Sequence, residues 1–236
     1  MGGGLDGPLP TSPRADCAGK AGARTDMTRV LDPIVLAGKH VRLEPLTRAH
    51  VPALLAAATS GSRETFGLTT VPGNQREAET YVDEALNLHA QGRALPFATV
   101  DVAGGEVVGS TRYLNIEFWP WPPGHPLQRG EDVPDVVEIG ATWLAPAAQR
   151  TPINTEAKLL MLTHAFEGWR VHRVSLVTDA RNDRSRNAIL RLGARFDGII
   201  RAARIAADSV IRDTACYSIV EAEWPDVKAG LRRRLE

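Results

Sequence analysis

The sequence has little of several features that define common classes of protein. Its 236 residues include two cysteines, Cys17 and Cys216, which are too few for a disulfide framework and, without a histidine cluster, for structural zinc. The 28 Lys and Arg residues balance the 28 Asp and Glu residues, so no overall positive field attracts nucleic acid. No apolar run is long enough to cross a bilayer. We therefore expect a cytoplasmic protein that binds no metal, nucleic acid or membrane.

Two nucleotide-binding motifs are also missing. No Gly-x-Gly-x-x-Gly follows a predicted strand, and no Gly-x-x-x-x-Gly-Lys-Ser/Thr is present. The sequence thus excludes a dinucleotide-binding Rossmann unit and a P-loop.

Residues 1–30 are rich in Gly, Pro and Ala and lack the apolar stretch of a secretory signal. Asp6, Asp16 and Asp26 argue against a transit peptide. We expect a disordered tail, or a true start at Met27, followed by a single domain over residues 31–236. About 200 residues suffice for one α/β domain with a full core.

Periodicity and turn residues predict the elements of this domain. The predicted helices are stopped or capped by residues such as Asn74 and Gly92, and Gly104-Gly105 turns a hairpin. The expected strands are 41–46, 97–102, 106–118, 135–144, 172–178, 195–206 and 210–220, and the expected helices are 49–58, 76–91, 154–169, 184–192 and 224–235. Such an order predicts a mixed α/β fold, with a mostly antiparallel central sheet flanked by helices.

The most informative stretch runs from Asp135 to Gly193. A predicted strand leads into the loop Gln149-Arg150-Thr151-Pro152-Ile153-Asn154, and a helix follows. The N-terminus of a helix offers free backbone N–H groups and a positive dipole end, which can hold a diphosphate. After the next strand, Asn182-Asp183-Arg184-Ser185 begins another helix.

This arrangement resembles the acyl-CoA site of the GNAT superfamily of N-acetyltransferases. The family loop commonly reads Gln-x-x-Gly-x-Gly/Ala; Gln149 matches it, whereas Pro152 and Asn154 replace the glycines. Asn182 and Ser185 match the Asn-x-x-Ser element of the RimJ/RimL-like branch. The ending is similar to that branch as well, with Arg212-Asp213, Tyr217-Ser218-Ile219 and Glu223-Trp224-Pro225. The resemblance covers roughly residues 35–230.

The resemblance implies a GNAT-like fold and acetyl-CoA as co-substrate. It implies that Asn182 binds the pantetheine arm and that Ser185 is the acid that protonates the leaving thiolate. The other residues that it places at the acyl-CoA are Trp143, Leu144, Gln149, Arg150, Thr151, Ile153, Asn154 and Thr155. Simpler interpretations are that Asn182 caps a helix, that Ser185 is an ordinary first-turn residue and that Trp143 belongs to the core.

A general base is needed because the attacking amine must lose a proton. Glu138 lies on the central strand that leads to the loop, and alternation predicts that Glu138, Gly140 and Thr142 share one face. The alternative is a strand carboxylate paired with Arg or Lys. His164, on the apolar side of a predicted helix, is expected to be a packing residue with its hydrogen bonds satisfied.

The sequence therefore predicts an enzyme that transfers an acetyl group from acetyl-CoA to a primary amine, either a protein N-terminus or a small amino compound. A catalytically silent CoA-binding sensor and an enzyme using a larger acyl group, such as succinyl, are the alternatives. The proline-rich segment 119–134 is expected to shape the acceptor pocket, and a homodimer is left open.

Overall fold

The computed structural model describes residues 29–206 and 208–236, so nearly all of the expected tail lies outside the described residues. Over these residues the chain forms one eight-stranded sheet in the order β1-β2-β3-β4-β5-β6-β8-β7. Among the strands of these ranges, only β5 and β6 pair in parallel, and every other neighbouring pair is antiparallel. The strands are β1 (Leu36–Ala37), β2 (Val41–Pro45), β3 (Ala94–Asp101), β4 (Val107–Glu117), β5 (Val136–Leu144), β6 (Arg173–Asp179), β7 (Arg195–Ile205) and β8 (Ile211–Val220).

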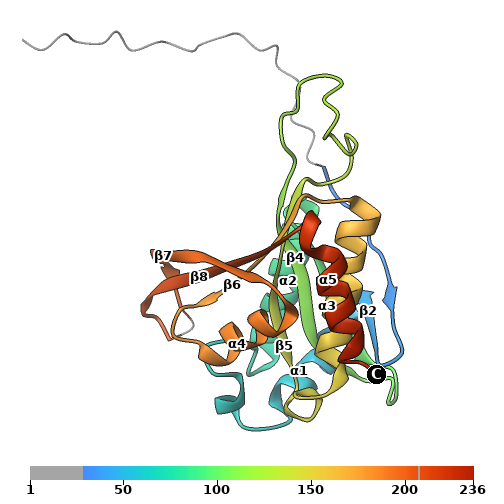
Figure 1. Cartoon of the computed structure of the whole chain (residues 1–236). Helices are drawn as coiled ribbons and strands as arrows, with labels where there is room; N and C mark the ends of the chain where they lie inside the picture. Colours follow the sequence, from blue (N-terminus) through green and yellow to red (C-terminus); the bar gives the residue numbers. More distant parts are fainter. Residues whose placement is uncertain (1–28, 207) are drawn as a thin grey trace, which may run out of the picture.

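In the described part of the chain, five α-helices flank the sheet (Figure 1). They are α1 (Val51–Thr59), α2 (Gln75–Ala90), α3 (Pro152–Thr163), α4 (Asp183–Leu192) and α5 (Trp224–Arg233). The predicted mixed α/β fold with a mostly antiparallel sheet is therefore confirmed. No helix within the described ranges is long and apolar enough to cross a membrane.

Local signals account for most helix ends. Asn74 caps α2 by accepting a hydrogen bond from the Glu77 N–H at 3.0 Å, and Gly193 ends α4 with a φ of 98°. Helix α3 begins two residues earlier than expected. The reason is that Thr151 acts as its N-cap and Pro152, whose φ is fixed near the helical value, occupies the first position. A π-helical turn, His164–Trp169, extends α3.

The two faces of the sheet carry separate cores. Helices α3 and α5 enclose the larger one, in which Phe97, Tyr113 and Met161 are fully buried. Helices α1 and α2 pack on β4 and β3 at the opposite face, around Leu54, Val82 and other apolar residues. In Figure 1 strands β6, β8 and β7 spread away from the body as an arm.

A buried carboxylate anchors α3 to the start of the domain. Glu156 is 7% exposed and accepts three backbone hydrogen bonds from the turn between β1 and β2: from Lys39 at 2.9 Å, His40 at 2.6 Å and Val41 at 2.8 Å. A Cβ at Gly38 would lie 2.5 Å from this carboxylate, so the close approach requires glycine. The contact holds α3, and with it the preceding loop, against the edge of the sheet.

Candidate active site

The central strands β5 and β6 separate from each other along their length. They pair over three residue pairs, from Val136↔Arg173 to Glu138↔Ser175. Beyond Glu138, β5 pairs with β4 as far as Leu144, while β6 pairs with β8 as far as Asp179. Within the described part of the chain, the edge of β5 that faces β6 therefore has no strand beside it after Glu138. Its backbone N–H and C=O groups can pair with an extended ligand.

A bulge in β5 lies at this separation. Ala141 has a φ of 48°, and the register with β4 shifts between Ser110 and Arg112. The extra residue reverses the alternation, so Thr142 points to the α3 side, where it contacts Lys158. Glu138 and Gly140 stay on the opposite face. The expectation that Glu138, Gly140 and Thr142 share one face is therefore wrong for Thr142.

The loop after β5 leads to the N-terminus of α3. Gln149 donates from Nε2 to the Leu144 carbonyl at 2.9 Å. The Thr151 hydroxyl donates to the Ala148 carbonyl at 2.7 Å and accepts from the Ile153 N–H at 3.3 Å. The Gln149 and Thr151 side chains thus hydrogen-bond within the loop and hold its conformation.

The residues around this loop differ in what they offer a ligand. Arg150 is exposed, with a φ of 62°, and Pro152 has no N–H group. Ile153 is buried, Thr155 is half-buried, and the Asn154 side-chain oxygen is buried without a partner among the described residues. At the third helical position, the Asn154 N–H has no partner within the helix. The available cationic and N–H donors are of the kind that a diphosphate requires.

The start of α4, which follows β6, lies on the other side of the space where β5 and β6 separate. The Asn182 side-chain oxygen accepts from the Ser185 N–H at 3.0 Å, which makes Asn182 the N-cap of α4. Its amide NH₂ group is not used by the cap. Ser185 is half-buried, and its hydroxyl forms no hydrogen bond within the described ranges. Asn182 therefore has the capping role that the simpler interpretation gave it, and the roles of Asn182 and Ser185 at the acyl-CoA stay predictions.

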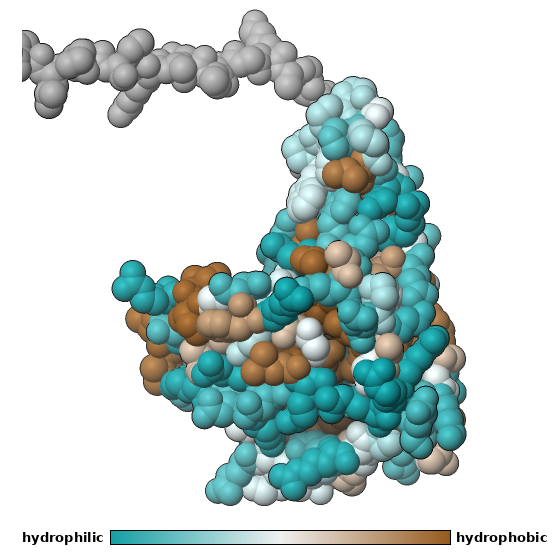
Figure 2. All heavy atoms as spheres, viewed as in Figure 1, coloured by the Kyte–Doolittle hydropathy of each residue, from teal (hydrophilic) through white to brown (hydrophobic). Residues whose placement is uncertain are grey.

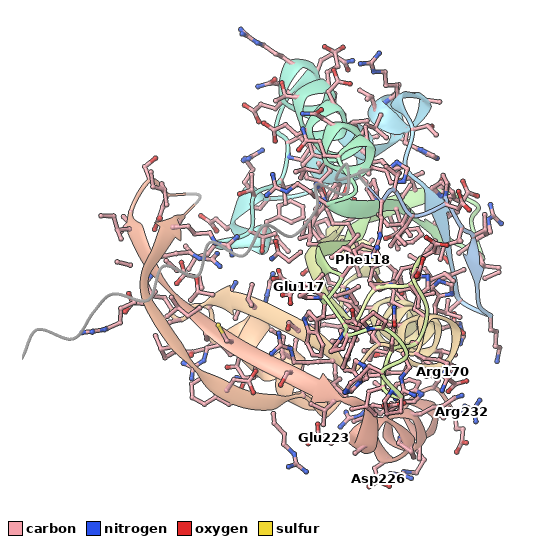
Figure 3. The ribbon with its side chains drawn as sticks, turned by 90° about the horizontal axis from the view of Figure 1, so that it is seen from above. Glu117, Phe118, Arg170, Glu223, Asp226 and Arg232 are labelled. Carbon is pink, nitrogen blue, oxygen red and sulfur yellow. The ribbon has the colours of Figure 1, made fainter. Side chains whose placement is uncertain are left out.

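Glu138 faces a pocket of about 610 Å³ between the body and the arm. Asn115, in a left-handed conformation, donates to the Glu138 carboxylate at 2.8 Å. Burial raises the pKa of Glu138, against the opposing influence of Asn115, Arg204 and Arg212. Figure 3 shows β7 and β8 curving away from the body, with Glu117 on the side of the body that faces them. The remaining lining comes from β4, β5, β6, β7 and β8.

Lys158 is a buried cation that the sequence analysis did not select. It is 4% exposed, and Nζ donates to Thr142 Oγ1 at 2.6 Å and to Thr111 Oγ1 at 3.0 Å. It forms no ion pair within the described residues, and burial lowers its pKa to about 7. A lysine on the buried side of α3, next to Ala157 and three residues before Met161, was the signal that could have revealed it.

The side chains of Trp143 and Leu144 lie in the cores. Trp143 is 4% exposed, contacts Phe66 and Tyr81 edge-on, and donates from Nε1 to the Tyr81 hydroxyl at 3.2 Å. Leu144 lies in the larger core. Their backbones, at the unpaired edge of β5, are the groups that can meet a ligand. His164 packs edge-on against Trp169, but its Nε2 is buried without a partner in the described ranges, so its hydrogen bonding is not satisfied as expected.

The segment 119–134 is fixed at the paired end of β5 and β6. Trp119 stacks on His172 with ring centroids 5.5 Å apart, and Trp121 donates from Nε1 to Asp135 at 2.6 Å. Arg129 forms a 2.7 Å ion pair with Glu221. No residue of this segment lines the 610 Å³ pocket. Trp119 donates to Glu117, a lining residue, at 3.2 Å. The role of this segment in shaping the acceptor pocket stays a prediction.

Comparison with known proteins agrees with this geometry. Residues 40–195 match the family model described as the acetyltransferase (GNAT) domain. A GCN5-related N-acetyltransferase from Brucella melitensis is 28% identical, with a TM-score of 0.72, over 89% of this chain and 90% of that one. An acetyltransferase structure from T. thermophilus is 32% identical, with a TM-score of 0.68, over 87% and 99%. Mycobacterium smegmatis RimJ in complex with CoA-disulfide shares the fold at 21% identity, with a TM-score of 0.66, over 87% and 93%. No curated protein matches the chain.

The chain belongs to the GNAT acetyltransferase family. Membership implies acyl transfer from an acyl-CoA to an acceptor.

Proposed function

We propose that the protein transfers an acetyl group from acetyl-CoA to a primary amine, and that the acceptor is a protein N-terminus or a small amino compound. The observation that carries the proposal is the separation of β5 from β6 after Glu138, between the start of α3 and the start of α4. This space combines an open backbone edge, a helix N-terminus and a buried carboxylate. We also propose that the protein belongs to the RimJ/RimL-like branch, on the basis of Asn182 and Ser185, and that it acts in the cytoplasm.

The binding roles follow from the positions of the residues. Pantetheine would pair with the backbone of β5 near Trp143 and Leu144 and contact the Asn182 amide. Arg150 and the N–H group of Asn154 would hold the diphosphate, with Gln149 and Thr151 maintaining the loop and Ile153 and Thr155 completing the first turn.

The chemical roles fall to two side chains. The amine nitrogen attacks the thioester carbonyl carbon, a C–N bond forms and the C–S bond breaks. The Glu138 carboxylate takes the proton that the amine loses, and the Ser185 hydroxyl gives a proton to the departing thiolate. Backbone N–H groups of β5 stabilise the oxyanion.

Thiol release from acetyl-CoA and succinyl-CoA, measured side by side with a panel of amines, tests the proposal. We expect amine-dependent thiol release together with a singly acylated product. CoA binding without release for any amine would instead indicate the silent CoA sensor, and the absence of CoA binding would contradict the proposed site.

Replacing Glu138 with glutamine should lower kcat by about 10²-fold, the usual contribution of a positioned base. Because burial raises the pKa of Glu138, wild-type activity should rise with pH above the ordinary carboxyl range, and this acidic limb should disappear in Glu138→Gln. The measurement is kcat between pH 5 and 9. Glu106→Gln, at the exposed turn between β3 and β4, is the control. An unchanged pH profile would remove Glu138 from the proton path.

Replacing Ser185 with alanine should reduce kcat about 10-fold while the Kd for acetyl-CoA changes less than about twofold, because the hydroxyl acts on the leaving thiolate and not on binding. Steady-state kinetics and calorimetric titration measure the two effects. Ser60→Ala, at an exposed position after α1, is the control. Equal effects on kcat and Kd would show that Ser185 only holds the ligand.

A further inference from the structure

Two arginines lie directly opposite each other on the arm. Arg204 of β7 is the register partner of Arg212 of β8, and like charges at such positions destabilise a sheet. Arg212 Nε donates to Thr214 Oγ1 at 3.3 Å. Within residues 29–206 and 208–236 neither arginine forms a salt bridge, although nearby Arg181 forms one with Asp179 at 2.7 Å. Arg204 is exposed and Arg212 is half-buried, and their guanidinium groups form a like-charged pair without a salt bridge in this part of the chain.

Strand alternation places both arginines on the face of the arm that forms the pocket. On β8, residues 212, 214, 216 and 218 project to one face, and Cys216 and Ser218 line the pocket. Register partners lie on the same face of a sheet. Arg204 therefore lies on the face of its partner Arg212, and in the same way Gly198, the partner of Cys216, lines the pocket beside it. The pair thus extends the pocket lining toward the end of the arm.

The charged side chains around this pocket lie at different positions along it. Glu138 lies in the pocket, and Arg204 and Arg212 are near enough to oppose the rise of its pKa. Asp179 lies on the same face but is already bound by Arg181 through both carboxylate oxygens. Burial, and then the neighbouring Arg204, lower the pKa of Arg212. Asp179 and Glu138 act in the opposite sense and raise the pKa of Arg212. Glu138 thus lies at one part of the pocket, and a pair of arginines without a salt bridge in the described residues lies toward the end of the arm.

We propose that Arg204 and Arg212 form a subsite for a carboxylate group carried by one of the two substrates. Paired guanidinium groups provide the fork of N–H donors that fits a carboxylate, and a bound carboxylate relieves their mutual repulsion. The carboxylate is either the free end of a dicarboxylic acyl group on CoA, or the acid group of an amino-acid-like acceptor whose amine lies at Glu138. The inference rests on the proposed acyl transfer and specifies its substrate class.

Two pairs of ligands distinguish the two sources of the carboxylate, the acyl donor and the acceptor. In the donor arm, calorimetric titration compares succinyl-CoA with butyryl-CoA, which has a methyl group in place of the carboxylate. In the acceptor arm, kcat/KM is compared for a panel of amino acids and for their neutral amides, with acetyl-CoA as donor. We expect at least a tenfold preference for the acidic member in one arm and none in the other.

The matched variants are Arg204→Gln and Arg212→Gln, with Arg191→Gln on exposed α4 as the control. Each test variant should abolish the preference, because the affinity or kcat/KM for the acidic ligand should fall about tenfold while the value for the neutral ligand stays unchanged. The control variant should keep the wild-type preference. The absence of a preference in both arms of the wild type, or equal losses for acidic and neutral ligands, would overturn the subsite.

Failure of the proposed function has a different signature. Without turnover for any amine, titration of the same amino acids and amides onto the CoA complex replaces the kinetic comparison. A charge preference that depends on the two arginines would then support the subsite in a protein that is not an enzyme.

Discussion

Replacing Lys158 with methionine is expected to stabilise the protein below pH 7. The ammonium group is buried and has only two hydroxyl partners. A pKa that falls from 10.5 to about 7 corresponds to a penalty of about 5 kcal/mol for the charged form, at roughly 1.4 kcal/mol per unit. Methionine has a similar length and no charge, and Thr111 and Thr142 still bond each other at 2.8 Å. After the loss of two hydrogen bonds, a net gain of about 2–3 kcal/mol is expected.

The direction in which stability changes with pH follows from the number of protons that the folded and unfolded states bind. Between pH 7 and pH 10.5 the unfolded chain carries the Lys158 proton and the folded chain does not, so the stability of the wild type rises with pH in this window. Below pH 7 both states are protonated, and the full penalty is present. The advantage of Lys158→Met should therefore be constant in acid and shrink between pH 7 and 10.

Urea unfolding from pH 6 to 10 measures this difference. Lys39→Met, at an exposed position, is the control and should show no such dependence. A Lys158→Met protein that is less stable than the wild type at pH 6 would show that the charged lysine contributes more through its hydrogen bonds than it loses by burial.

Replacing Glu156 with alanine is expected to destabilise the fold by about 3–5 kcal/mol, because each hydrogen bond to a charged group contributes roughly 1.5–3 kcal/mol and three backbone N–H groups lose their acceptor. For a chain of this size, the melting temperature should fall by about 10 °C. Thermal unfolding followed by circular dichroism measures the change.

Glu84→Ala, at an exposed position of α2, is the control for helix and charge effects. Should Glu156→Ala not fold, Glu156→Gln offers a second measurement, since it keeps one acceptor oxygen and should lose less. A shift no larger than that of the Glu84 control would show that water replaces the carboxylate at the turn between β1 and β2.

The fold could be predicted because its signals are local. Asn74, Gly92 and Gly105 mark turns and helix ends by their own conformational preferences, and strand alternation marked the sheet. The bulge at Ala141 could not be predicted, because alanine has no preference for a positive φ; the pairing with β4 imposes it. The side to which Thr142 points was therefore assigned wrongly.

The candidate site could be predicted only in part, because only some of its residues form a local pattern in the sequence. Asn182, Ser185 and the loop around Arg150 form a short pattern along the chain. Lys158 meets Thr111 across 47 residues, and Arg204 faces Arg212 across a hairpin whose register is shifted between Ile200 and Arg204. These relations depend on tertiary pairing, which a single sequence does not display. Glu138 was found because it lies on the strand that leads directly to the loop.

The three residue pairs that join β5 to β6 have a consequence for substrate range. Within the described residues, the arm pairs with the body of the sheet only through this short stretch of backbone, so the angle at which it leaves the body determines the width of the 610 Å³ pocket. Figure 2 shows the arm standing out from the body, with apolar side chains at its outer part. The register partners Ile205 and Ile211, at the end of the β7–β8 hairpin, are exposed. Changes at Val136, Val137 or their partners on β6 would tilt the whole arm. Such changes offer a way to alter the width of this pocket without replacing any residue that lines it on β7 or β8.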